Sequence, residues 1–277
     1  MPNSLTLTAP AKLNLFLHIV GRRSDGYHLL QSLMTFIDFN DEITLSLRTD
    51  GLIRRLGQYG VDEEEDLVVK AARLLQSHAK ANLGVDIAYK KRIPMGGGLG
   101  GGSSDAASVL IGLNKLWRLG VSRRELEELG LILGADVPFF VGGESAFVEG
   151  VGEILHPFHV PPRWFLVLNP GIGVSTAEVF RDPELTRDSQ PVKMSNFSGI
   201  IGRNDLQPVV VKRIPEVGLL LDWLRQWGDA RMSGSGTCCF VAFDSQEEAY
   251  QAWLAKPVQF DGFIARSMNY HPLREWL

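Results

Sequence analysis

Cysteine is scarce in this sequence: Cys238 and Cys239 are the only two among 277 residues. Adjacent cysteines rarely reach disulfide geometry, and two thiols alone build neither a disulfide framework nor a four-ligand zinc site. A chain of this length buries a full hydrophobic core without such cross-links. The scarcity therefore indicates a reducing compartment, and we expect the protein to be cytoplasmic.

Long apolar runs and a surplus of charge are also missing. No apolar segment approaches the ~18 residues that a membrane span needs, and the N-terminus lacks the features of a signal peptide. Lysine and arginine number 28 against 32 acidic residues, a net charge of −4, which leaves no basic surplus for wrapping nucleic acid. We therefore expect a small-molecule partner and a monomer or weak dimer, with no nucleic acid and no membrane bound.

The chain has no internal repeat, but a proline-bearing stretch at 157–162 divides it. Because 277 residues are about twice the ~100–150 of a common domain, we expect two domains, 1–157 and 158–277. Strand and helix patterns are mixed without regular alternation, which predicts the α+β class. The expected strands cover 5–19 (one strand, or a pair broken near Pro10), 42–48, 85–89, 146–148, 164–168 and 238–243. The expected helices cover 67–78, 106–119, 125–133, 217–227 and 246–255.

The first expected strand alternates between apolar and mainly polar positions. A period of two places alternate side chains on one face of a strand. Lys12 and Asn14, two residues apart, should therefore point in the same direction. Taken alone, each is an ordinary residue of a solvated strand face.

Glycine is the residue in excess, and six of the 29 lie between 96 and 102. So many glycines are entropically costly in a mere connection, but they suit a backbone that approaches a ligand closely and turns through positive φ. With a strand before and an amphipathic helix after, successive N–H groups can hold phosphate oxygens, and Ser103 or Ser104 can cap the helix. A flexible linker or tight turn is the alternative.

Two common nucleotide-binding motifs do not account for this loop. No lysine follows the glycines, which excludes the lysine-bearing P-loop. Gly96, Gly98 and Gly101 match the dinucleotide spacing G-x-G-x-x-G, but no acidic residue closes a second strand about 20 residues on. A dinucleotide-dependent oxidoreductase is therefore a remote alternative.

With its flanks, the loop at 94–105 (PMGGGLGGGSSD) resembles the phosphate loop of the GHMP kinases, named for galactose, homoserine, mevalonate and phosphomevalonate kinases. Segments 10–15 (PAKLNL) and 21–28 (GRRSDGYH) narrow the resemblance to members that act on a cytidyl substrate of the non-mevalonate isoprenoid pathway. Further matching segments, in order along the chain, are 133–138, 149–154, 204–206 and 232–238.

The resemblance implies a two-domain α+β fold with the active site in the interdomain cleft. It also implies transfer of the γ-phosphoryl group of ATP, with Mg²⁺, to the 2-hydroxyl of 4-(cytidine 5'-diphospho)-2-C-methyl-D-erythritol. A homoserine- or mevalonate-type GHMP kinase is one alternative, against which the Gly-Tyr-His segment argues. A non-catalytic nucleotide-binding module is another, which would need neither Lys12 nor Asp136.

The resemblance also assigns roles to single residues. Asp136 matches the catalytic base, and Lys12 matches the lysine that orients the base and the hydroxyl. The residues expected to hold the ATP phosphates are Pro94, Met95, Gly96, Gly97, Gly98, Leu99, Gly100, Gly101, Gly102, Ser103 and Ser104. The residues expected to bind the substrate are Asn14, Tyr27, His28, Thr176 and Phe180. Within that set Tyr27, His28 and Phe180 match positions that hold the cytosine, and no residue is assigned to a metal. Asp66 and Thr237 depart from the family's pattern near the adenine and the rim.

Asp136 also has a purely structural interpretation. It lies between Gly134, typical of a helix end, and Val137-Pro138, typical of a helix start, so it can serve as a cap. The apolar residues that follow place its carboxylate beside a low-dielectric region, where it needs a cation, and Lys12 is the candidate. A base steadied by a cation suits phosphoryl transfer, and the motif match favours this role.

Overall fold

Two long strands form the centre of the structure, a computed structural model that describes residues 3–194 and 202–277. β1 (Ser4–Arg22) and β2 (His28–Arg48) run antiparallel, with register shifts after Pro10, Asn14 and Ile19. Of the two alternatives for 5–19, one continuous strand is confirmed: β1 passes Pro10 unbroken, and the extra residues of the irregularity, Asp38 and Phe39, lie opposite in β2. Such an irregularity accommodates a proline, which has no N–H to donate to the ladder.

Strand β2 is also the hub of the sheet. It pairs with β4 (Gly84–Lys90), β5 (Ala146–Glu149) and the last residues of β10 (Asp261–Met268). The rest of β10 pairs with β7, so β10 connects the two ends of the molecule. The strand order is β3-β4-β2-β10-β7-β9-β8, with β1 and β5 paired to β2 and β6 paired to β5. The other strands are β3 (Ile53–Arg55), β6 (Ile154–Pro157), β7 (Trp164–Asn169), β8 (Arg231–Met232) and β9 (Cys239–Phe243).

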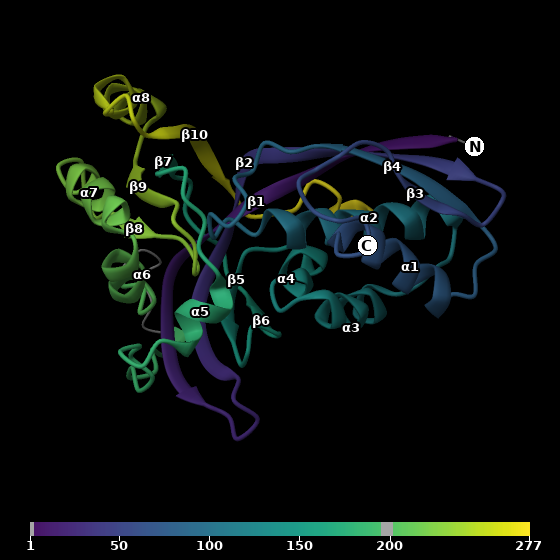
Figure 1. Cartoon of the computed structure of the whole chain (residues 1–277), viewed down its shortest axis with the longest axis horizontal. Coiled ribbons are helices and arrows are strands. Elements are labelled where there is room, and N and C mark those ends of the chain that lie inside the picture. Colours follow the sequence, from purple (N-terminus) through teal and green to yellow (C-terminus); the bar gives the residue numbers. More distant parts are fainter. Residues whose placement is uncertain (1–2, 195–201) are drawn as a thin grey trace.

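Helices gather at both ends of this sheet. Figure 1 shows α1 to α4 near β3 and β4 at one end, and α6 to α8 near β8, β9 and β10 at the other. The helices are α1 (Leu67–His78), α2 (Gly101–Trp117), α3 (Arg123–Leu133), α4 (Val137–Gly142), α5 (Thr176–Arg181), α6 (Gln207–Arg213), α7 (Pro215–Leu224) and α8 (Gln246–Ala255). Among the helices of the two described ranges, none is long and apolar enough to cross a membrane.

Local capping interactions define several helix starts. The Asp66 side chain accepts a hydrogen bond from the first turn of α1, and α3 and α8 begin with capping boxes at Ser122 and Ser245. The helices predicted at 67–78 and 246–255 are confirmed with those bounds. The helix predicted from residue 106 instead begins at Gly101, so the last glycines of the loop are helical.

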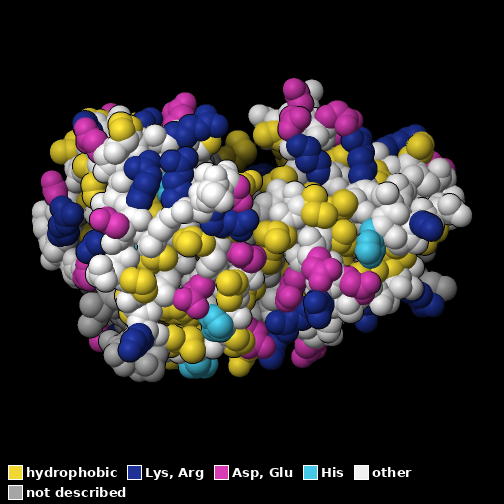
Figure 2. Space-filling model, turned by 90° about the horizontal axis from the view of Figure 1, so that it is seen from below, with side chains coloured by type: hydrophobic (Ala, Val, Ile, Leu, Met, Phe, Trp, Pro, Cys, Tyr) yellow, Lys and Arg dark blue, Asp and Glu magenta, His cyan; other side chains and the backbone are white. Residues whose placement is uncertain are grey.

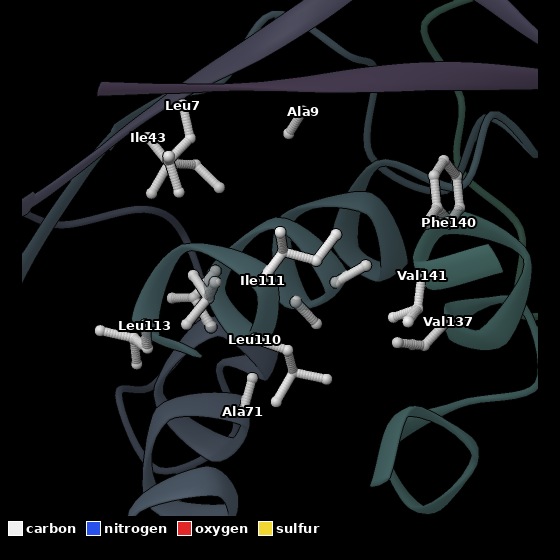
Figure 3. Close-up of a cluster of buried hydrophobic side chains, with 14 of the residues drawn as sticks. Leu7, Ala9, Ile43, Ala71, Leu110, Ile111, Leu113, Val137, Phe140 and Val141 are labelled. Atoms are coloured by element: carbon white, nitrogen blue, oxygen red, sulfur yellow. The ribbon is translucent and has the colours of Figure 1, made fainter. Parts of the chain in front are cut away.

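Among the residues that the structure describes, three hydrophobic clusters form the core. Figure 3 shows part of the first, in which Leu7 and Ile43 of the central strands lie above Ile111 of α2. The second cluster packs α6, α7 and α8 against β7 and β9, and includes Leu166, Val210, Leu221, Val241 and Ala252. The third lies on the central strands and includes Phe16, Leu33, Phe147, Phe165 and Phe240. Full burial of such side chains contributes ~1.5–3 kcal/mol each. Mixed strands and helices with these clusters confirm the α+β class.

The last residues of the chain return to the first cluster. Leu273 is buried in it, and Trp276 and Leu277 pack against it. The C-terminal residues therefore stabilise the end of the molecule built from the first half of the chain. The expected boundary between 157 and 158 stays a prediction.

Candidate active site

A cleft of about 720 Å³ lies where β1, the glycine loop, α5 and the turn between β8 and β9 meet. Its size suits a nucleotide-sized ligand. All the expected phosphate- and substrate-binding residues line it except Ser104.

On the outer face that Figure 2 shows, basic and acidic side chains are interspersed, a pattern unlike the basic stripe of a nucleic-acid-binding surface.

Backbone hydrogen bonds from β1 and from the residue before β9 hold the glycine loop. The Lys12 N–H donates to the Leu99 carbonyl (3.0 Å), and the Cys238 N–H donates to the Gly97 carbonyl (3.1 Å). Helix α2 starts directly after the loop, with Gly100 as N-cap and no side-chain cap. The first N–H groups of α2 are therefore free of side-chain competitors at the positive end of the helix, where anions bind.

Close backbone packing explains two of the glycines. A Cβ on Gly98, whose φ is +77°, would lie 1.9 Å from the Ser233 carbonyl oxygen, and a Cβ on Gly236 would lie 2.0 Å from the Gly98 nitrogen. Only residues without a side chain fit at such distances. The second glycine cluster of the sequence, at 233–236, is therefore the support on which the glycine loop rests.

Lys12 and Asp136 both line the cleft and pair within it. Lys12 Nζ lies 3.5 Å from Asp136 Oδ2; the lysine side chain is 3% exposed and the aspartate side chain 33%. Lys12 Nζ also donates to Asn14 Oδ1, which confirms that these two side chains share a face. Asp136 occupies the N-cap position of α4, but its side chain makes no capping hydrogen bond. The capping interpretation of its carboxylate is therefore wrong.

Aromatic side chains line a second part of the cleft, called the aromatic end below. The His28 and Phe180 rings lie 5.1 Å apart at an interplanar angle of 34°, and Tyr27 in the β1–β2 turn is 66% exposed. Thr176 Oγ1 lies 2.7 Å from the hydroxyl of Ser235, in the support of the glycine loop. The aromatic side chains and the glycine loop therefore line one cleft.

The two serines that end the glycine motif are placed differently from expectation. Ser103 lines the cleft, whereas Ser104 is fully buried and donates to the Pro10 carbonyl (2.7 Å). Both lie inside α2, so the prediction that one of them caps the helix is wrong. The helix starts earlier than propensity suggests because tertiary packing keeps Gly101 and Gly102 helical.

A buried ionic cluster beneath the loop was missed by sequence reasoning. Lys91, which lines the cleft, donates to Asp105 (2.6 Å) and to Asp41, and Asp41 also accepts the N–H of Ile93 (2.9 Å). Burial raises the pKa of Asp105 to about 7, because desolvation outweighs the opposing attraction of Lys91. The only sequence signal was the position of Lys91 and Asp105 on either side of the glycines.

The two departures from the family's pattern have structural partners. Asp66 caps α1, pairs with Arg55 (2.7 Å) and accepts from the hydroxyl of Tyr89. Thr237 donates its hydroxyl hydrogen to the Ile172 carbonyl (2.6 Å). Both residues therefore make contacts within the protein, and neither lines the cleft.

Family models match both halves of the chain. The model of the GHMP kinases N terminal domain matches residues 66–144, and the model of the GHMP kinases C terminal domain matches residues 189–257. The first match contains the glycine loop and Asp136. The second contains the turn that supports the loop.

Whole-chain relatives are more specific. The chain is 54% identical over 275 residues to a 4-diphosphocytidyl-2-C-methyl-D-erythritol kinase of Thiobacillus denitrificans, with 99% of each chain covered. It is 53% identical to a kinase of the same name from Aromatoleum aromaticum, covering 97% of this chain and 95% of the relative.

Solved structures give the same fold. A crystal structure of 4-(cytidine 5'-diphospho)-2C-methyl-D-erythritol kinase matches with a TM-score of 0.82 at 34% identity, covering 95% of this chain and 99% of the other. A homoserine kinase from Cytophaga hutchinsonii matches with a TM-score of 0.67 at 16% identity, which shows the fold alone; 98% of this chain and 96% of the other are covered. The chain belongs to the GHMP kinase family, and within it to the 4-diphosphocytidyl-2-C-methyl-D-erythritol kinases.

Proposed function

We propose that this enzyme transfers the γ-phosphoryl group of ATP to the 2-hydroxyl of 4-(cytidine 5'-diphospho)-2-C-methyl-D-erythritol, a step of the non-mevalonate pathway to isoprenoid precursors. The observation that carries the proposal is the position of the Lys12–Asp136 pair. It lies in the same cleft as the glycine loop and the aromatic end formed by His28 and Phe180.

In this mechanism Asp136 accepts the proton of the 2-hydroxyl as the hydroxyl oxygen attacks the γ-phosphorus and the bond to the leaving ADP oxygen breaks. Lys12 pairs with the carboxylate and positions the hydroxyl, since its ammonium is buried beside both Asp136 and Asn14. The methylerythritol carbon that bears this hydroxyl is tertiary, so positioning contributes as much as basicity. The backbone N–H groups of the loop and of α2 hold the phosphates.

Mg²⁺ is proposed to enter the site with ATP. The described residues contain no group of three or more histidine, cysteine or acidic side chains that could hold a metal ion. A site without such a group fits an ion that is ligated mainly by nucleotide phosphates, as is usual for magnesium. Such an ion would neutralise charge on the transferred group. We further propose that the enzyme works in the cytoplasm as a monomer or weak dimer.

The test is steady-state turnover of ATP with Mg²⁺ and each of three acceptors: the cytidyl substrate, homoserine and mevalonate. We expect turnover with the cytidyl substrate and at least ~10²-fold lower kcat/KM with the other two, because neither of them can fill the aromatic end. Preferential turnover of homoserine or mevalonate would replace the proposed substrate. Binding of ATP without turnover of any acceptor would favour a non-catalytic nucleotide-binding module.

A further inference from the structure

Arg187, in the segment after α5, connects the residues of the aromatic end. Its guanidinium donates to the carbonyls of Phe180 (3.2 Å), Asp182 (2.7 Å) and Leu185 (2.9 Å). Its Nε donates to His28 Nε2 at 3.1 Å. The Phe180 carbonyl belongs to the last turn of α5, where carbonyls lack helical partners. One half-buried side chain therefore fixes the end of α5, the loop after it and a ring from the start of β2.

The hydrogen bond to His28 defines the protonation of its ring. A guanidinium only donates, so Nε2 of His28 has to accept. An imidazolium, or a neutral ring with its hydrogen on Nε2, would direct two N–H groups at each other. The neutral ring with its hydrogen on Nδ1 is the state that remains. Burial, followed by the positive charges of Arg187 and Arg22, lowers the pKa of His28 and so acts in the same direction.

This leaves Nδ1 as the ring atom available to a ligand. His28 lines the cleft, and within residues 3–194 and 202–277 no hydrogen bond from a protein group occupies Nδ1. The His28 ring is also kept beside Phe180, because Arg187 bonds both residues. The donor on His28 and the stacking surface of Phe180 are thus fixed relative to each other by the same arginine.

We propose that Arg187 is a positioning residue for base selection, which holds His28 with its proton on Nδ1 and thereby presents a hydrogen-bond donor to the pyrimidine of the substrate. The inference rests on the proposed function, which supplies the cytidyl group. Cytosine offers two acceptors on its pairing edge, O2 and N3, whereas uracil carries a hydrogen on N3. Since O2 is an acceptor in both bases, the preference arises from N3: a donor that faces N3 favours a cytidyl over a uridyl substrate.

Kinetics of two variants test the proposal. Arg187→Met should raise KM for the cytidyl substrate about tenfold, as expected for one lost or misdirected hydrogen bond, and should reduce the preference over the uridyl analogue by a similar factor. KM for ATP should change less than about twofold, because the phosphates are held elsewhere. Arg213→Met is the matched control: Arg213 pairs with Asp182 in the same segment but makes no bond to His28. It should leave both KM values and the preference unchanged.

A direct readout of the tautomer accompanies the kinetics. Long-range ¹H–¹⁵N spectra of the wild-type enzyme, with the His28 signals assigned from His28→Gln, should show a protonated Nδ1 and an unprotonated Nε2. Arg187→Lys, which keeps the charge but not the planar donor, should show both tautomers, and this variant serves if Arg187→Met does not fold.

Three results would overturn the inference: a proton on Nε2 in the wild type, an unchanged base preference in the Arg187 variants, or an equal loss in Arg213→Met. Failure of the proposed function is a separate outcome. In that case the wild type would not phosphorylate the cytidyl substrate, whatever the state of His28.

Discussion

The two ends of the cleft are built in opposite ways. At the phosphate end the protein surface is backbone: Gly98 and Gly236 pack so closely that neither accepts a Cβ. At the base end it is side chains, and Tyr27 is mainly exposed. Phosphate is the same group in every nucleotide and is recognised by N–H groups, whereas a base is recognised by the shape and donors of side chains. Backbone recognition thus accounts for the common part of the reaction, and side-chain recognition for the particular substrate.

The largest effect should come from Asp136, the proposed general base. Asp136→Asn keeps the shape of the side chain but removes the proton acceptor, so kcat should fall ~10²–10⁴-fold while ATP still binds. Steady-state kinetics with a parallel measurement of ATP affinity checks this. A near-normal kcat would show that Asp136 is not the general base. Positioning and electrostatics would then account for the rate.

The Lys12–Asp136 pair should also behave as one unit. Lys12→Ala should lower kcat, and the double variant should lose less than the product of the two single losses. The double-mutant cycle therefore measures the coupling of the two side chains. Multiplicative losses would mean that the two side chains act independently despite their 3.5 Å separation.

Displacing the backbone of the glycine loop, the phosphate end of the cleft, should weaken the binding of ATP. Gly98→Val places a side chain where the Ser233 carbonyl lies and strains a φ of +77°, so KM for ATP should rise roughly 10²-fold. Gly120→Val is the matched control, since Gly120 has a φ of +67° but no atom within 4 Å of its Cβ position. Comparable ATP kinetics in a folded Gly98→Val enzyme would argue against phosphate binding by this loop.

A change at the aromatic end, the base end of the cleft, should weaken the binding of the cytidyl substrate and not that of ATP. Stacking on an aromatic ring contributes ~1–3 kcal/mol per base, so Phe180→Ala should raise KM for the cytidyl substrate by roughly one to two decades. Phe263→Ala, which removes a ring stacked on Phe39, is the control, because neither residue lines the cleft. Equal changes in the KM values for both substrates would remove the assignment of Phe180 to the base.

The smallest effect concerns the buried cluster beneath the loop. The pKa of Asp105, raised to about 7, means that the folded state binds a proton that the unfolded state releases near pH 4. Stability therefore falls as pH rises from about 4 to 7, and the full penalty remains above that. Asp105→Asn should raise Tm by a few degrees at pH 8, since ~1 kcal/mol corresponds to ~2–4 °C at this size, and much less at pH 5. Thermal scans at both pH values decide; an equal change at each would mean that the Asp105 charge is not the cause.

The parts of the site that the sequence predicted are those defined by local spacing. Lys12 and Asn14 share a face because a strand has a period of two, and the glycine run is visible as composition. Residues 28–41 were missed as a strand because most of them are buried on both faces and show no alternation. The start of α2 was missed because glycine has low helix propensity.

Contacts between segments that are far apart in the sequence could not be predicted from its pattern. Ser233 donates to the Gly98 carbonyl across 135 residues, and Arg187 reaches His28 across 159. No periodicity relates such positions, because their pairing depends on how the sheet brings β1, β2 and β8 together. The support of the phosphate end and that of the base end therefore became visible only in the folded chain.

Equilibrium binding tests the division of the cleft most directly. Calorimetric titration of Gly98→Val and Phe180→Ala, each with a non-hydrolysable ATP analogue and with the cytidyl substrate, separates affinity from turnover. We predict that Gly98→Val weakens the ATP analogue at least tenfold and leaves the cytidyl substrate within about twofold, and that Phe180→Ala does the reverse. Parallel losses of both ligands in both variants would contradict the account, because the two ends would then form a single site without separate roles.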